Sequence, residues 1–133
     1  MEPMVNIALR AARKAGNLIA RASDDLTRLR FEAKGKADFV TEVDLASERE
    51  LIFNLQKTYP DHAFLCEESG RTGPEDAEYI WIIDPLDGTS NFMRGIPHYC
   101  ISIACTKAGK VEHAVVLDPV RQEEFTASRG RGA

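Results

Sequence analysis

The sequence is poor in the residues that build disulfide scaffolds and zinc sites. It has three cysteines among 133 residues, an odd number without the paired spacing of a metal site. Its three histidines are scattered and match no zinc pattern. We therefore expect reduced thiols, a cytoplasmic location and no zinc held by thiolates.

Long apolar runs and an excess of positive charge are also missing. No apolar stretch approaches the roughly 20 residues of a membrane span. Arg10, Arg13 and Lys14 interrupt the N-terminal stretch, which excludes a secretory signal. With 17 basic and 21 acidic side chains the formal net charge is −4, which argues against strong independent nucleic-acid binding. We expect no membrane partner and no strong independent binding of nucleic acid.

What remains is the composition of a globular domain, with 44% hydrophobic and 29% charged residues. Apolar periodicity predicts helices over residues 3–22 and from about 41 to 59, with a polar loop over 24–38 between them. The basic end of that loop is either a linker or a segment that reaches an anionic substrate. Strands are predicted over residues 63–66, 79–84, 101–107, 111–117 and 124–127.

This order of elements predicts an α/β fold of the α+β type, with two helices packed on a largely antiparallel sheet. The segment 128–133 is a loop with no closing element. We therefore expect residues 1–133 to be the N-terminal part of a domain that continues beyond them.

The most informative segment is 81–91 (WIIDPLDGTSN), where an apolar strand runs into two carboxylates. Because Pro85 cannot donate to a sheet ladder, we expect the strand to end at Asp84. A turn then brings Asp84 and Asp87 to one side, where two charges about 4 Å apart repel by about 4 kcal/mol. Oxygen ligands in such a pair favour Mg²⁺, Mn²⁺ or Ca²⁺. Ordinary turn chemistry is the alternative, because Asp-Pro and Asp-Gly pairs often cap their own backbone.

Two further acidic segments lie where regular structure meets a loop. Asp44 ends the segment 38–44 (DFVTEVD), and Glu67 with Glu68 follows the strand 63–66. Strand ends can converge on one cleft, where only metal ions would neutralise so many carboxylates. Each has a simpler alternative: Thr41 and Asp44 have the spacing of a helix capping box, and the two glutamates suit an exposed loop.

The chemistry that suits this set is metal-assisted hydrolysis of a phosphate monoester by activated water. The amides of Gly88 and Thr89 can face a phosphate oxygen, because Gly88 lets the backbone approach a ligand. A Thr89 hydroxyl bonded to Asp44 can orient or deprotonate the water. The sequence has no Gly-x-x-x-x-Gly-Lys-Ser/Thr loop and no Gly-x-Ser-x-Gly elbow, so the usual NTPase and serine-hydrolase motifs are absent.

The segments 38–44, 67–69 (EES) and 81–92 together resemble the inositol monophosphatase family of Mg²⁺-dependent, lithium-sensitive phosphatases. The resemblance spans essentially the whole chain. It implies a layered α-β-α-β-α sandwich, usually homodimeric, of which this chain supplies the first helical layer and most of the larger sheet. It also implies a carboxy-terminal half that contributes a further aspartate.

The resemblance implies a role for each motif residue. Glu67 and Asp84 would bind one Mg²⁺ with the carbonyl of Leu86, and Asp84 would bridge to a second ion held by Asp87. Two or three ions are implied, and Mn²⁺ or Ca²⁺ can replace Mg²⁺ in binding. The implied catalytic residues are Asp44, Thr89 and Glu67, and the implied substrate contacts are Leu86, Asp87, Gly88 and Thr89.

The activity implied is hydrolysis of inositol-1-phosphate to inositol and phosphate, with this chain alone weakly active or inactive. One alternative changes the substrate to a sugar bisphosphate or a 3′-phosphonucleotide. Another is a role as a partner of Nus factors and RNA polymerase in transcription antitermination and ribosome biogenesis, as in one bacterial branch of the family. In that role the phosphatase site is secondary.

Overall fold

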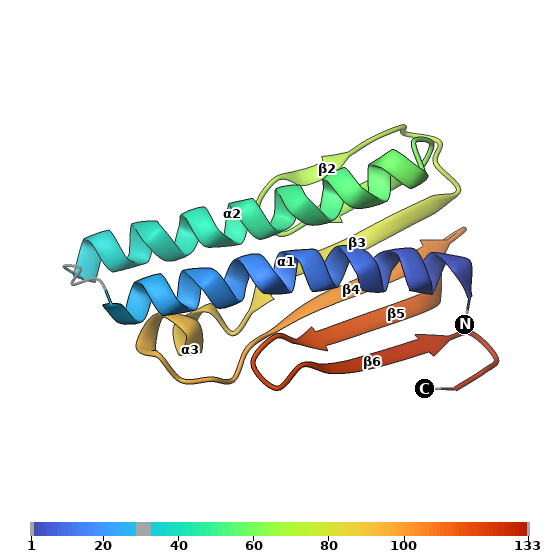
Figure 1. The fold of residues 1–133 in the computed structure, drawn as a ribbon. Helices are drawn as coiled ribbons and strands as arrows, with labels where there is room; N and C mark the ends of the chain where they lie inside the picture. The colour runs from blue at the N-terminus through green and yellow to red at the C-terminus, as the bar shows by residue number, and fades with distance from the viewer. Residues whose placement is uncertain (1, 29–32, 133) are drawn as a thin grey trace.

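Two long helices lie side by side on one face of a sheet in the computed structural model, which describes residues 2–28 and 33–132 (Figure 1). They are α1 (Pro3–Arg28) and α2 (Ala33–Thr58), and they pack against each other as well as on the sheet. Among the described residues, neither these helices nor any other carries the continuous apolar stretch that a membrane span requires.

The sheet has six strands in the order β2-β1-β3-β4-β5-β6, and every neighbouring pair is antiparallel except β1 with β3. The predicted packing of helices on a largely antiparallel sheet is confirmed. The short strand β2 and the short helix α3 were not predicted. The elements are β1 (Ala63–Cys66), β2 (Gly70–Thr72), β3 (Tyr79–Asp87), α3 (Thr89–Arg94), β4 (Cys100–Lys107), β5 (Lys110–Asp118) and β6 (Glu123–Ser128).

The polar loop predicted over residues 24–38 is wrong apart from residues 29–32, which lie outside the described part. Helix α1 continues to Arg28 because Ala22 and Leu26 extend its buried stripe. Helix α2 begins at Ala33, so its basic first turns are helical and not a loop. The capping-box alternative is also wrong, because Thr41 lies inside α2 and its hydroxyl donates to the Ala37 carbonyl at 3.1 Å.

Small residues let α1 lie close to the sheet. Ala8, Ala12 and Ala15 of α1 are fully buried, and Gly16 lies directly over β5. A Cβ atom at Gly16 would stand 2.8 Å from Leu117 Cδ2, so the buried Leu117 side chain would have to shift to admit it. The close approach of the helix to the sheet therefore explains this glycine.

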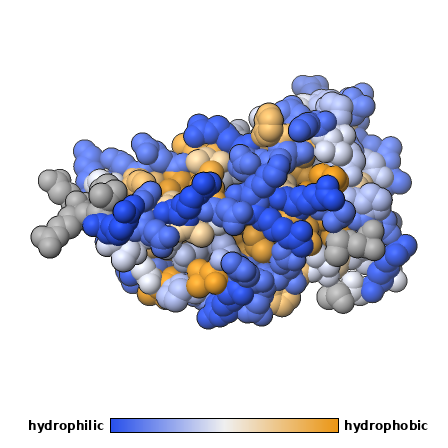
Figure 2. All heavy atoms as spheres, viewed as in Figure 1, coloured by the Kyte–Doolittle hydropathy of each residue, from blue (hydrophilic) through white to orange (hydrophobic). Residues whose placement is uncertain are grey.

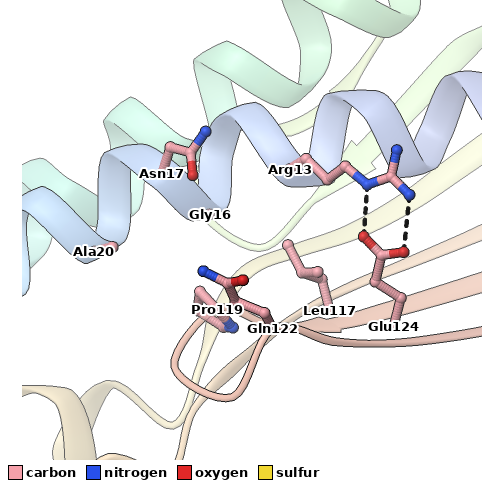
Figure 3. Close-up of a pocket in the computed structure, with 8 residues that line it drawn as sticks. All are labelled: Arg13, Gly16, Asn17, Ala20, Leu117, Pro119, Gln122 and Glu124. Atoms are coloured by element: carbon pink, nitrogen blue, oxygen red, sulfur yellow. Dashed lines mark hydrogen bonds and ion pairs between the residues drawn. The ribbon is translucent and has the colours of Figure 1, made fainter.

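A salt bridge joins α1 to the edge strand β6 beside a hollow of about 390 Å³ (Figure 3). Arg13 donates through Nε and Nη2 to the two carboxylate oxygens of Glu124, at 2.5 and 2.9 Å. The opposite face of the sheet has no helical layer within the described residues, and it leaves Leu65, Ile82 and Phe125 exposed. This one-sided covering is what the first layers of a layered sandwich provide.

An aromatic cluster closes the end of the sheet where β3 begins. The His62 ring stacks between Tyr59 and Tyr79, with ring centroids 4.6 and 4.8 Å apart. Trp81 Nε1 donates to His62 Nδ1 at 2.9 Å, so that nitrogen must be unprotonated. Burial lowers the pKa of His62, although the nearby carboxylates of Asp61 and Glu78 oppose the shift.

The stability that His62 contributes should therefore decrease as the pH is lowered. Its folded-state pKa is lower than the value of about 6.5 in an unfolded chain. The contribution is therefore complete above about pH 6.5 and is lost as the pH falls from that value through the lower folded-state pKa. Urea unfolding of the wild type and of His62→Gln, which cannot titrate, measures this. The wild type should have the larger free energy of unfolding at pH 8, and this difference from His62→Gln should be lost at pH 5. A difference that does not depend on pH would contradict the lowered pKa of His62.

Candidate metal centre

The motif that carries Asp84 and Asp87 lies in a bulge near the end of β3. Asp84 pairs with Ser102 of β4 and Asp87 with Cys100, so three steps along β3 match two along β4. The prediction that the strand ends at Asp84 is wrong, because the bulge takes Pro85 out of the ladder and pairing resumes at Asp87. Bulges redirect side chains, and this one sets the two aspartates along the same strand end.

Helix α2 is fastened to this bulge by a buried hydrogen bond. Ser47 Oγ donates to the carbonyl of Pro85 at 2.8 Å, and both residues are buried. A buried hydrogen bond of this kind holds position strongly, because losing one partner leaves the other without a partner, at a cost of about 1–3 kcal/mol. The bond fixes the register of α2 over the motif, and with it the position of Asp44, one turn earlier.

A glycine and a returning segment shape the loop after Asp87. Gly88 has a φ of 94°, and a Cβ atom there would stand 3.0 Å from the His98 carbonyl and 3.2 Å from Tyr99 Cβ. Asn91 Nδ2 donates to the same His98 carbonyl at 2.9 Å. Thr89 begins α3 directly after Gly88. Packing thus holds the chain around the predicted phosphate contacts in place, and position 88 requires glycine.

Two acids of α2 are buried beside the motif. Asp44 and Glu48 are 7% and 2% exposed, and they lie one turn apart on the face of α2 that meets the sheet. Asp44 Oδ1, Glu48 Oε1 and Asp84 Oδ1 are buried without a hydrogen-bond partner among the described residues. A buried carboxylate oxygen without a partner is costly, so such atoms indicate a missing cationic or donor group.

The electrostatics of Asp44 and Asp84 show that acids from three segments converge. The pKa of Asp44 is raised to about 7, chiefly by burial and then by the charges of Glu68, Glu67, Asp84 and Glu48 in that order. No lysine or arginine contributes to that pKa. Acids of α2, the end of β1 and the β3 motif therefore lie near enough to influence the charge of Asp44, and their convergence on one metal-binding cleft stays a prediction.

Asp84 lies at the centre of this group. Its pKa is raised to about 6, chiefly by burial and then by the charges of Glu67 and Asp87, while a hydrogen bond from the Leu86 amide opposes the shift. Cys100 lies beside Asp87, with its Sγ 4.0 Å from Oδ2.

The donor set fits a divalent oxygen-ligated cation such as Mg²⁺, because the carboxylates have unpaired buried oxygens and no basic side chain of the described residues is among the causes of their pKa shifts. Within the described ranges, however, no three His, Cys, Asp or Glu side chains are already arranged to hold a metal ion. Glu67, Glu68 and Asp87 are exposed, so their side chains are free to move toward an ion.

Comparison with known protein families matches residues 1–133 to the inositol monophosphatase family. The chain belongs to the inositol monophosphatase family. It is similar to the Nus factor SuhB of Pseudomonas aeruginosa, at 58% identity over 135 residues, which covers all of this chain and 50% of that protein. The chain thus spans about half the length of the curated relatives it matches.

Solved structures of the family share the fold. The structure is similar to that of the extragenic suppressor protein SuhB from Bartonella henselae, with a TM-score of 0.85 and 39% identity over 97% of this chain and 50% of that one. It is also similar to an inositol monophosphatase from Anabaena, with a TM-score of 0.80 and 34% identity over 96% of this chain and 44% of the other. The predicted α/β fold of the inositol monophosphatase family is thereby confirmed.

Sequence reasoning missed two buried residues beside the motif, Ser47 and Glu48. Both follow Asp44 at the spacing of one helical turn, in line with the buried Leu51 and Leu55. That spacing was the available signal. The pairing of Thr89 with Asp44, and the ligand roles of Glu67, Asp84, Leu86 and Asp87, stay predictions.

Replacing Asp44 by Asn should stabilise the metal-free chain above neutral pH. The pKa of Asp44 is raised to about 7, so burying its charge costs stability that is lost as the pH rises through the interval from about 4 to about 7. At pH 8, Asp44→Asn should raise the free energy of unfolding by between about 1 and 4 kcal/mol. Urea unfolding of the wild type and of Asp44→Asn in the presence of a chelator measures this. A lower free energy of unfolding for Asp44→Asn at pH 8 would contradict the crowding of like charges around Asp44.

Proposed function

We propose that this chain is the N-terminal, metal- and phosphate-binding part of a Mg²⁺-dependent phosphatase that hydrolyses inositol-1-phosphate to inositol and phosphate. Membership of the inositol monophosphatase family supports a phosphatase. The observation that carries the proposal is the pair of buried, unpartnered carboxylate oxygens of Asp44 and Asp84, which lie near further acids and have no basic partner among the described residues.

In this proposal the motif holds the ions and the phosphate. Glu67, Asp84, Asp87 and the carbonyl of Leu86 would hold Mg²⁺, which when bound neutralises charge on the phosphate and lowers the pKa of the attacking water. Gly88 and Thr89 would position a phosphate oxygen at the start of α3. The rigid packing of Gly88 against the His98 and Tyr99 segment supports this, because the loop needs no rearrangement to receive it.

Asp44 would be the final acceptor of the proton of the attacking water. The Thr89 hydroxyl would relay that proton by giving its own to Asp44, and Glu67 would help to orient the water. A carboxyl whose pKa lies near neutral pH is well suited to be the final acceptor, because it is partly deprotonated yet basic enough to take a proton. Ser47 supports the role by fixing α2 against the Pro85 carbonyl. The remaining contacts to inositol, and a further aspartate, would come from a carboxy-terminal half in a homodimer. We place the enzyme in the cytoplasm, since all three cysteines are free thiols.

A second function is favoured by the relatives themselves. The similar protein of Pseudomonas aeruginosa is called a Nus factor. In this proposal the chain contributes to a protein that binds Nus factors and RNA polymerase during transcription antitermination, and phosphate hydrolysis is secondary. Hydrolysis of a sugar bisphosphate or a 3′-phosphonucleotide remains the alternative for the substrate.

Phosphate release from inositol-1-phosphate should require Mg²⁺ and the motif aspartates. In the whole polypeptide, Asp84→Asn and Asp87→Asn should each lower kcat by about 100-fold or more, because each removes a charge that holds the ions. The matched control is Asp76→Asn, an exposed acid of the loop before β3, which should leave kcat unchanged.

Hydrolysis that persists in a chelator, or in Asp84→Asn, would overturn the metal-dependent proposal. Faster release from a sugar bisphosphate or a 3′-phosphonucleotide would change the substrate. A protein without activity on any of the three that still co-purifies with transcription factors would favour the second function.

A further inference from the structure

A groove of about 500 Å³ runs along the outer side of the helical layer, away from the acidic centre. It lies between the first half of α1 and the last turns of α2, and Lys57 stands about 20 Å along α2 from Asp44 at the helical rise. Its lining residues are Ile7, Arg10, Ala11, Arg13, Lys14, Asn54, Lys57 and Thr58. We call this the α1–α2 groove.

All ionisable side chains that line the α1–α2 groove are cationic, although the chain as a whole has a net charge of −4. Within the described residues, no carboxylate lies within ion-pair distance of Arg10, Lys14 or Lys57. Lys14 Nζ instead donates to Asn54 Oδ1 at 3.1 Å. Like charges gathered without counter-charges repel each other, so an anionic partner would relieve a cost that the protein otherwise bears.

Neighbouring hollows on the same helices are balanced in charge. The hollow near the end of α1 brings Arg21 and Arg28 together with Asp24 and Asp25. The hollow on the sheet side of α1 contains the Arg13–Glu124 pair (Figure 3). The segregation of positive charge is thus particular to the α1–α2 groove and is not a general property of α1.

The floor of the groove is apolar. Ala11 is buried and Ile7 is half-buried, between cationic side chains on either side. Figure 2 shows this helical face as mainly hydrophilic, with hydrophobic residues visible between the polar ones. A narrow apolar strip between charged rims matches the two faces of an amphipathic segment.

We propose that the α1–α2 groove binds an acidic, amphipathic segment of a partner protein. Apolar side chains of the segment lie on the half-buried Ile7, while its carboxylates meet Arg10, Lys14 and Lys57. A single-stranded nucleic acid fits less well, because no aromatic side chain lines the groove to stack a base. The inference is independent of the metal centre and of phosphate hydrolysis.

Fluorescence anisotropy with a labelled helical peptide tests this. The probe is a peptide of about 15 residues with leucine at helical spacing and glutamate elsewhere, titrated with the intact chain at low salt. The triple variant Arg10→Gln/Lys14→Gln/Lys57→Gln should bind it at least about 10-fold more weakly, because three rim charges are lost. The matched control Lys34→Gln/Arg49→Gln/Lys110→Gln changes the same net charge at exposed positions outside the groove lining and should stay within about 2-fold.

Thermal unfolding of both triple variants shows that each is folded before binding is compared. Equal weakening by the two variants would overturn the site, since net charge alone would explain it. Equal affinity for a peptide with serine in place of leucine would overturn the amphipathic partner, as would tighter binding of a single-stranded RNA of about 12 nucleotides. Self-association of the chain that the groove variant abolishes would assign the groove to a second copy instead.

Discussion

The structure depends on one unfavourable interaction, the burial of neighbouring carboxylate oxygens for which the described residues supply no counter-charge. Asp44 and Asp84 lie on different elements, and the charge of Asp84 adds to the raised pKa of Asp44. Burial is the largest cause of the raised pKa of both groups. A folded chain tolerates such crowding only where function or a ligand compensates for it. The rest of the fold serves to hold this arrangement in place.

Two local features of the fold hold these carboxylates in place. The bulge in β3 lets Pro85 sit within a strand while pairing continues to Asp87. The Ser47 hydroxyl then binds the Pro85 carbonyl and keeps α2 in register over the bulge. The small residues of α1 pack on the other half of the same sheet, so both helices lie on one face. Charge is segregated along this layer, with the acids at the strand ends and the cations of the α1–α2 groove near the opposite end of α2.

Much of this could be predicted from the sequence, because alternating apolar residues define β4 and β5 and the helical stripes define α1 and most of α2. The motif containing Asp84 and Asp87 was found from residue chemistry alone. The predicted strand end at Pro85 failed because a bulge depends on the partner strand, which no local rule contains. The loop before Thr41 failed because tertiary packing of Val40 and Val43 outweighs the weak helix propensity around Gly35. Glu48 was missed because glutamate is rarely buried.

The most direct test of a carboxylate site that requires a divalent ion is the count of protons released when the ion binds. Because the pKa of Asp44 is about 7 and that of Asp84 about 6, both hold protons in part near pH 6.5, and binding must displace them. Calorimetric titration with Mn²⁺ near that pH, in two buffers of different ionisation enthalpy, measures the count. We predict a buffer-dependent heat that corresponds to proton release and that is lost in Asp84→Asn. Binding heats that are equal in both buffers, or no binding at millimolar Mn²⁺, would contradict the account.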